Sequence, residues 1–191
     1  MIDIRMYSTS LSSRIAQFTI GLFAVFAFSQ CSVMNTNSSG KASRGLFTSF
    51  FVGDDGTQYF IKPLEFNGVD GGDELLIDFT FRYRDEISGD TRLNTSLLTA
   101  DLVKDLDSVK FSNDKYTAVT KNSDLMFNQR QNKNIESRHE VYLPLADMKN
   151  IFDNPEWEIV FFYAGKQRTF VADKRTRKKI EALNHDIFEL F

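Results

Sequence analysis

Residues 74–84 (Glu-Leu-Leu-Ile-Asp-Phe-Thr-Phe-Arg-Tyr-Arg) alternate apolar and mostly polar side chains. Every odd-numbered position from Leu75 to Tyr83 is apolar, and Asp78, Thr80 and Arg82 lie between them. Successive side chains of a strand point to opposite faces, so the pattern predicts a strand with one buried face and one solvated face. Strands of this kind are typical of antiparallel sheets. This segment therefore directs the chain towards a β-rich fold.

Further strands are predicted along the chain after the first 45 residues. They cover residues 46–52, 57–66, 91–98, 138–143, 157–164 and 167–171, with shorter apolar pieces around 109–111, 116–119 and 125–127. The turn signals Gly53–Gly56, Ser88–Asp90 and Gly165-Lys166 join neighbouring strands into hairpins. Pro63 has no N–H to donate, so it is expected at a sheet edge or a bulge. The segment 157–164 is apolar on both faces, which predicts a central or doubly covered strand.

A helix is expected at the end of the chain. Asp173 is a suitable N-cap, and the helix is predicted to run to about Leu190. Its apolar residues recur every three or four positions and form one stripe that should pack on the sheet. These residues are Ile180, Leu183, Ile187 and Leu190. A short helical turn is also predicted over 145–152. The elements together predict a mainly β fold, either an antiparallel β-sandwich or a bent sheet, with a C-terminal α-helix.

The N-terminal part has a different pattern. Arg5 and Arg14 precede or flank an apolar run over residues 15–28, and Cys31, the only cysteine of the chain, follows soon after it. A helix of fourteen residues is about 21 Å long, which is less than the roughly 30 Å of a bilayer core. The arrangement is typical of a secretion signal that ends in a lipid-attachment cysteine.

The tetrapeptide Phe28-Ser29-Gln30-Cys31 resembles the lipobox of bacterial lipoproteins, in which Phe28 takes the place of the usual Leu. The resemblance implies a diacylglycerol on the Cys31 thiol, cleavage before it, and acylation of the new amino group by a fatty acid such as palmitate. In some Gram-negative bacteria, an Asp directly after the cysteine holds a lipoprotein at the inner membrane. Ser32 occupies that position here, so the resemblance implies an outer-membrane lipoprotein, with its domain facing the periplasm. A secreted protein cleaved nearby and an uncleaved N-terminal anchor remain as alternatives.

The chain is thus expected to have three parts: a signal peptide (1–30), a lipidated flexible tether (31–45) and a single β-rich globular domain (46–191). Without residues 1–30 it has 21 basic and 25 acidic residues, a net charge near −4. An acidic balance argues against nucleic acid as a partner. The domain has no cysteine, which excludes disulfides, thiol catalysis and cysteine metal sites within it.

No catalytic, cofactor or metal site is predicted. His139 and His185, the only two histidines, occur in no metal or triad motif and are expected on the surface. The loop 67–74 contains three acids and an Asn among glycines, and such oxygen ligands are the kind that bind Ca²⁺, but it lacks the spacing of an EF-hand. A solvated hairpin connection is the preferred interpretation.

Five cations lie within six residues at the start of the final helix. They are Lys174, Arg175, Arg177, Lys178 and Lys179, called the basic patch below. Positive charge is disfavoured at a helix N-terminus, at a small and screened cost. The patch is interpreted as a solvated face, with contact to anionic headgroups or an acidic partner as the alternative.

The predicted function is binding or scaffolding in the cell envelope, with the membrane as one partner through the lipid and an envelope protein or glycan as another. An envelope hydrolase acting on glycan or peptidoglycan is the alternative, using acids such as Asp78 or Glu158. A third hypothesis is a carbohydrate- or lipid-binding module with exposed aromatic residues such as Tyr59, Tyr142 or Tyr163.

Overall fold

Ten antiparallel strands dominate the computed structural model, which describes residues 45–191, all within one folded unit. The strands are β1 (Phe47–Phe51), β2 (Thr57–Gly68), β3 (Glu74–Tyr83), β4 (Asp90–Thr99), β5 (Ser108–Ser112), β6 (Thr117–Thr120), β7 (Ser123–Gln131), β8 (Asn134–Pro144), β9 (Glu158–Tyr163) and β10 (Lys166–Ala172). The helices are α2 (Leu145–Phe152) and α3 (Lys174–Asp186), with 3-10 turns η1 (Gly53–Asp55) and η2 (Phe188–Leu190). Among the described residues, neither α2 nor α3 has the length and apolar composition of a membrane-spanning helix.

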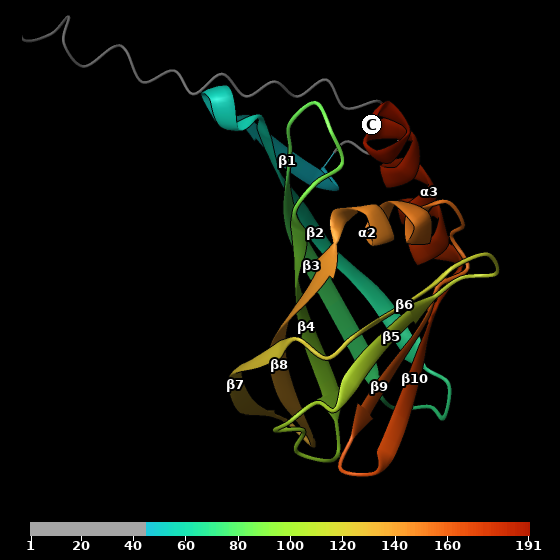
Figure 1. Ribbon diagram of the computed structural model, residues 1–191. Helices are drawn as coiled ribbons and strands as arrows, with labels where there is room; N and C mark the ends of the chain where they lie inside the picture. The colour runs from blue at the N-terminus through green and yellow to red at the C-terminus, as the bar shows by residue number, and fades with distance from the viewer. Residues whose placement is uncertain (1–44) are drawn as a thin grey trace, which may run out of the picture. The chain divides into compact units, whose positions relative to one another are not determined.

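The strands form one sheet in the order β6-β5-β9-β10-β2-β3-β4-β8-β7, and β1 pairs with β2 beside this path. The two outer strands, β6 and β7, are connected only by Lys121 and Asn122. Consecutive Cα atoms are 3.8 Å apart, so this connection spans at most about 11 Å. The sheet must therefore curl until its edges approach, and the Asn122 carbonyl accepts a hydrogen bond from the Tyr142 N–H of β8 (3.3 Å). The result is a half-barrel (Figure 1), which is the predicted bent sheet.

The prediction for Pro63 is confirmed in the form of a bulge. The register between β2 and β3 shifts between Ile61 and Leu64. On its other edge, β2 pairs with β1 up to Ile61 and with β10 from Phe66 onwards. Pro63 lies in the gap between these two partners, where its missing N–H costs no ladder hydrogen bond.

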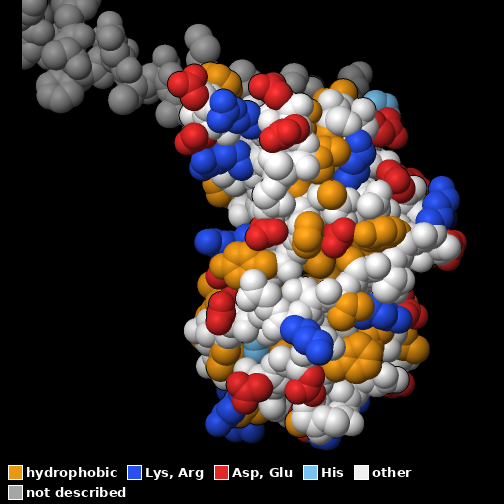
Figure 2. All heavy atoms as spheres, in the orientation of Figure 1, with side chains coloured by type: hydrophobic (Ala, Val, Ile, Leu, Met, Phe, Trp, Pro, Cys, Tyr) orange, Lys and Arg blue, Asp and Glu red, His pale blue; other side chains and the backbone are white. Residues whose placement is uncertain are grey.

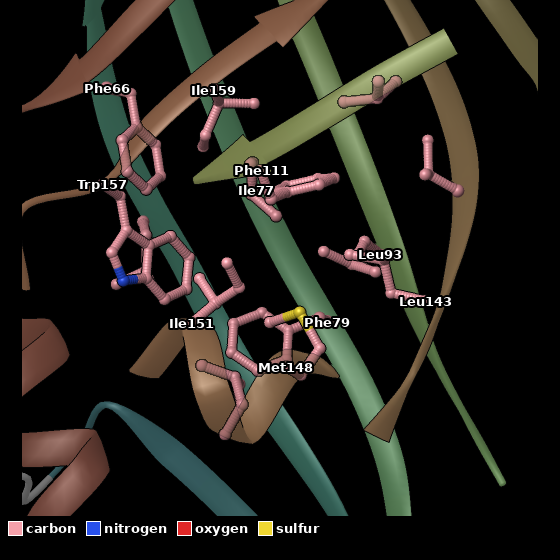
Figure 3. Packing of buried hydrophobic residues seen from close by; sticks show 14 of the residues in the cluster. Phe66, Ile77, Phe79, Leu93, Phe111, Leu143, Met148, Ile151, Trp157 and Ile159 are labelled. Carbon is pink, nitrogen blue, oxygen red and sulfur yellow. The ribbon is translucent and has the colours of Figure 1, made fainter. Parts of the chain in front are cut away.

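The core fills the inside of the half-barrel and is closed by α2, which lies across the space between the two sides of the sheet (Figure 1). Met148 and Ile151 of α2 point towards sheet residues such as Phe79, as Figure 3 shows, and all three are fully buried. Phe152 of α2 packs in T-shaped fashion on Trp157, with ring centroids 4.7 Å apart. The apolar positions of the alternating segment 74–84 thus became the inner face of β3, as predicted.

Helix α3 begins as predicted, because the Asp173 carboxylate accepts a hydrogen bond from the Thr176 N–H (2.7 Å). That hydrogen bond lowers the pKa of Asp173 below its usual range. The helix ends earlier than predicted, at Asp186. Leu190 is consequently 72% exposed, and Phe188 is buried in its place.

The hairpin of β7 and β8 is longer than the sequence pattern predicted. Only the apolar pieces around 125–127 and 138–143 were expected to be extended. Asn132 adopts a left-handed conformation (φ 55°) in the turn between the strands, as Asn tolerates better than most residues. The polar half of the hairpin gains side-chain bonds instead of apolar burial: Gln129 and Gln131 both donate to the Glu136 carboxylate.

Candidate functional site

The outer face of the sheet carries a groove of about 830 Å³ above β2, β3 and β4, beside β8. It is lined by Asp55, Gln58, Phe60, Thr80, Phe81, Arg82, Arg84, Ser88, Gly89, Asp90, Arg92 and Tyr142; we call it the arginine groove. Its three arginines and two aspartates come from the polar face of the alternating strands and from the turns at their ends. Figure 2 shows basic and acidic side chains interleaved around the hollow at the left margin of the molecule.

One side of the arginine groove is a chain of hydrogen bonds between β2, β3 and η1. Gln58 donates through Nε2 to the Phe81 carbonyl (2.9 Å) and accepts from Arg82 Nε (3.3 Å). Arg82 also forms an ion pair with Asp55, 3.2 Å between nitrogen and oxygen. Both ions are about half exposed or more, so the pair itself adds little stability. Its effect is to hold the guanidinium in place.

The other side is a similar chain between β4 and β8. Arg92 Nε lies 3.1 Å from a Glu140 carboxylate oxygen, and the other Glu140 oxygen accepts a hydrogen bond from the Tyr142 hydroxyl. This hydrogen bond, assisted by burial, raises the pKa of Tyr142 above its usual value. Arg92 also lies 5.8 Å from the centre of the Tyr142 ring, within the range of a cation–π contact. The ring and both charges are thereby fixed relative to one another.

Arg84, directly after β3, differs from the other two arginines of the groove. It is exposed, and residues 45–191 offer it no ion-pair partner. It also lines a second groove of about 380 Å³, which it shares with Phe51, Asp54, Thr57, Tyr83 and Asp85, among others. Arg84 is therefore the position at which the two grooves meet.

A second polar network lies further along the same outer face. Arg138 of β8 contacts Asp78 of β3 (2.6 Å) and donates to Ser96 of β4 (2.8 Å). Asn94 donates to the other Asp78 oxygen (2.8 Å). Asp78, which the hydrolase hypothesis names, is thus fully engaged in fixing three strands. Glu158, the other named acid, pairs with Lys110 (3.0 Å), so the two carboxylates occupy separate ion pairs.

The three tyrosines of the third hypothesis differ in their environment. Tyr142 lines the arginine groove, as a ligand-contacting aromatic would. Tyr59 faces inwards and stacks on Phe81, with ring centroids 5.0 Å apart, and Tyr163 is only 4% exposed. The prediction that these two are exposed is wrong, because both belong to the core face of their strands. Phe60 is 42% exposed at the groove and was missed, although its position next to Tyr59 on a strand places it on the opposite face.

His139 is not a surface residue as predicted: it is 1% exposed on the inner face of β8. Its Nε2 lies 3.2 Å from the Val103 carbonyl, and the Val103 N–H donates to Ser137 Oγ (3.2 Å). Burial lowers the pKa of His139 below its ordinary 6.5, although the Val103 contact and Asp105 act in the opposite direction. His139 therefore fixes the loop between β4 and β5. His185 is on the surface as predicted, with its side chain 78% exposed.

The loop 67–74 shows no cation site. Asp73 forms an ion pair with Arg168 (3.1 Å), which also lies 3.6 Å from Asp101. The pKa of Asp73 is raised above its usual value, mainly by burial. The neighbouring Asp101 and Asp70 raise it further, and Arg168 opposes them without reversing the direction. Within residues 45–191 no group of three or more His, Cys, Asp or Glu side chains is placed to hold a metal ion.

The basic patch is divided by its ion pairs. Arg177 pairs with Glu156, and Lys179 lies 3.8 Å from Glu65. Lys174, Arg175 and Lys178 are exposed at the first turns of α3. Arg177 thus binds α3 to the loop before β9, and Lys179 binds it to β2. The other three cations form a smaller charged surface than the sequence indicated.

The predicted signal peptide (1–30) and the predicted lipidation of Cys31 lie outside the described residues. Comparison of the whole chain with protein-family models, curated proteins and solved structures gives no match in any of the three. The candidate site therefore rests on its geometry alone.

Proposed function

We propose that this protein is a lipid-anchored component of the cell envelope whose domain, residues 46–191, binds a glycan in the arginine groove. The anchor is the lipid on Cys31, and attachment at the outer membrane places the domain in the periplasm. Several acyl chains, at about 0.8 kcal/mol per buried methylene, make such attachment effectively permanent. The protein acts by binding and has no cofactor.

The observation that carries the glycan proposal is the combination of fixed polar groups and aromatic rings in one open groove. Gln58, Arg82 and Arg92 offer planar donors, and Asp55 and Asp90 offer acceptors. Sugar hydroxyls donate and accept, so a mixed lining suits them better than a lining of one charge sign. Phe60 and Tyr142 add apolar ring surface for the C–H faces of a sugar.

The geometry also favours binding over hydrolysis. The two aspartates of the arginine groove are Asp55, held by Arg82, and Asp90, at the first residue of β4. The acids that the hydrolase hypothesis names are each neutralised by a cation elsewhere on the sheet. A rigid polar surface without a free, buried carboxylate pair is the kind of site that recognises a polymer and leaves it intact.

The anchor is tested by Cys31→Ser in the native host. The variant should lose its lipid, leaving an unprocessed precursor or a domain released from membranes, as judged by mass spectrometry and membrane fractionation. A variant with the mass and the membrane partition of the wild type would contradict the proposal.

Glycan binding is tested with the purified full-length chain and an array of envelope-type oligosaccharides. Arg92→Ala combined with Tyr142→Phe should reduce binding at least tenfold, because it removes a donor and frees the ring. Lys110→Ala, on β5 away from the groove, is the matched control and should bind as the wild type does. Equal loss in both variants, or no loss in the first, would contradict binding in this groove.

A further inference from the structure

Arg84 is the cation of the candidate site that lacks a carboxylate partner. Arg82 and Arg92 each have a carboxylate partner within 3.2 Å, whereas Arg84 has none among the described residues. A guanidinium is always charged and offers a planar fork of donors that matches a carboxylate. An exposed arginine without a partner inside a groove is thus available to an anion from outside.

The backbone that carries Arg84 is tightly constrained. Gly56 approaches it so closely that a Cβ on Gly56 would lie 2.2 Å from the Tyr83 carbonyl oxygen and 2.8 Å from Arg84 Cβ. On its other side, Asp85 has φ 51°, in the left-handed region that few non-glycine residues adopt. The Glu86 N–H donates back to the Arg84 carbonyl (2.5 Å). Such a backbone fixes the point from which the Arg84 side chain extends into the groove.

The charges around Arg84 restrict the anion that fits. The arginine groove has three arginines and two aspartates. The second groove shares Arg84 with it and adds two more aspartates, Asp54 and Asp85. The combined lining has three cations and four anions. A dense polyanion, such as a polysulfated chain, would meet repulsion along most of this surface. A ligand with a single carboxylate places its one negative charge at the unpaired Arg84 and its neutral groups beside the aspartates.

On this basis, and resting on the glycan-binding function proposed above, we propose that Arg84 binds the carboxylate of one uronic-acid-type sugar within an otherwise neutral oligosaccharide. The sugars on one side lie in the arginine groove against Phe60 and Tyr142. Those on the other side lie in the second groove near Phe51, which is 68% exposed. Arg84 is then the residue that selects acidic over neutral glycans.

The test uses matched pairs of oligosaccharides on one array, each with a single uronic acid in one member and the carboxyl-reduced sugar in the other. Polysulfated oligosaccharides of the same length are included. The full-length wild-type chain should bind the acidic member of at least one pair about tenfold more tightly than its neutral counterpart. Arg84→Gln should abolish that preference and retain affinity for the neutral member. Arg175→Gln, which removes an exposed cation on α3, is the control and should change neither the preference for the acidic member nor the affinity for the neutral one.

Three results would overturn this inference. Equal binding of both members of every bound pair would remove the role of the carboxylate while leaving glycan binding itself intact. Tightest binding to the polysulfated chains would show that charge density, and not one carboxylate, is recognised. Absence of binding to every printed glycan would refute both this inference and the function on which it rests.

Discussion

Gly53 and Gly56 lie at the two ends of η1, yet their backbones differ in what they permit. Gly53 has φ 64° with open space where a Cβ would be. Gly56 has φ 85° and ψ −146°, a region that is almost exclusive to glycine, and its Cβ would collide with the Tyr83 carbonyl. Gly56→Ala should therefore destabilise the domain by more than about 3 kcal/mol, and Gly53→Ala by about 1–2 kcal/mol.

Chemical denaturation of both glycine variants measures this difference. The Asp-Gly turn signal identified the turn in the sequence, but it gave no reason to distinguish the two glycines, because the collision involves a carbonyl 27 residues further along the chain. Similar costs for the two substitutions would show that the contact between η1 and the end of β3 is looser than described.

Protonation of His139 should couple folding to pH. Its pKa is lowered in the folded state, so unfolding takes up a proton when the pH falls below the ordinary value of 6.5. The corresponding stability is fully present above pH 6.5 and is lost as the pH falls through the lower, folded-state pKa. Melting temperatures measured from pH 8 to pH 5 should fall more steeply for the wild type than for His139→Gln.

The second histidine provides the control. His185 is exposed, so His185→Gln should retain the steep wild-type dependence. Equal slopes for the wild type and His139→Gln would mean that other groups dominate the acid response. The comparison uses slopes because His139→Gln also changes the contact with Val103 and lowers stability at every pH.

At the scale of elements, the apolar stripe predicted for the C-terminal helix is buried over α3 and exposed at its last residue. Ile180 and Leu183 are fully buried, whereas Leu190 lies beyond the helix and is exposed. Leu183→Ala should cost about 2–5 kcal/mol, which corresponds to a fall in melting temperature of about 5–15 °C for a domain of this size. Leu190→Ala should change it by less than about 2 °C. Differential scanning calorimetry of both variants tests the docking of α3, and a wild-type melting temperature for Leu183→Ala would show that the helix is undocked.

Most elements follow from local pattern, and the exceptions share a cause. The periodicity of apolar residues predicted β3, β4, β9 and α3, because each of these elements buries at least one continuous apolar face. It missed most of β7 and the first half of β8, where Gln129, Gln131 and Glu136 stabilise the pairing by side-chain hydrogen bonds that have no hydrophobic signature. The arginine groove was missed for a related reason: its residues are the polar positions of separate strands, and only the strand order β2-β3-β4-β8 brings them together.

At the scale of the whole molecule, the sequence predicted a sandwich or a bent sheet and left the choice open. Two features that no local pattern contains decide it. The first is the two-residue connection between the outer strands β6 and β7, which forces the edges together. The second is α2, which follows β8 and fills the end of the curl with Met148, Ile151 and Phe152 in place of a second sheet.

Because the core that the structure describes lies within residues 46–191, we expect the fragment 46–191 to fold alone, with a cooperative melt and a circular dichroism spectrum dominated by β-structure. Its first residue already contributes, since the Leu46 carbonyl accepts a hydrogen bond from the Lys62 N–H (2.8 Å).

A fragment that begins at Gly53 should be much less stable. It lacks β1, so Phe47 leaves the core and the N–H and C=O groups of the first half of β2 become an unpaired edge open to aggregation. A non-cooperative melt of the fragment 46–191 would show that residues before Leu46 contribute to the core, and equal stability of the two fragments would show that β1 contributes nothing to it.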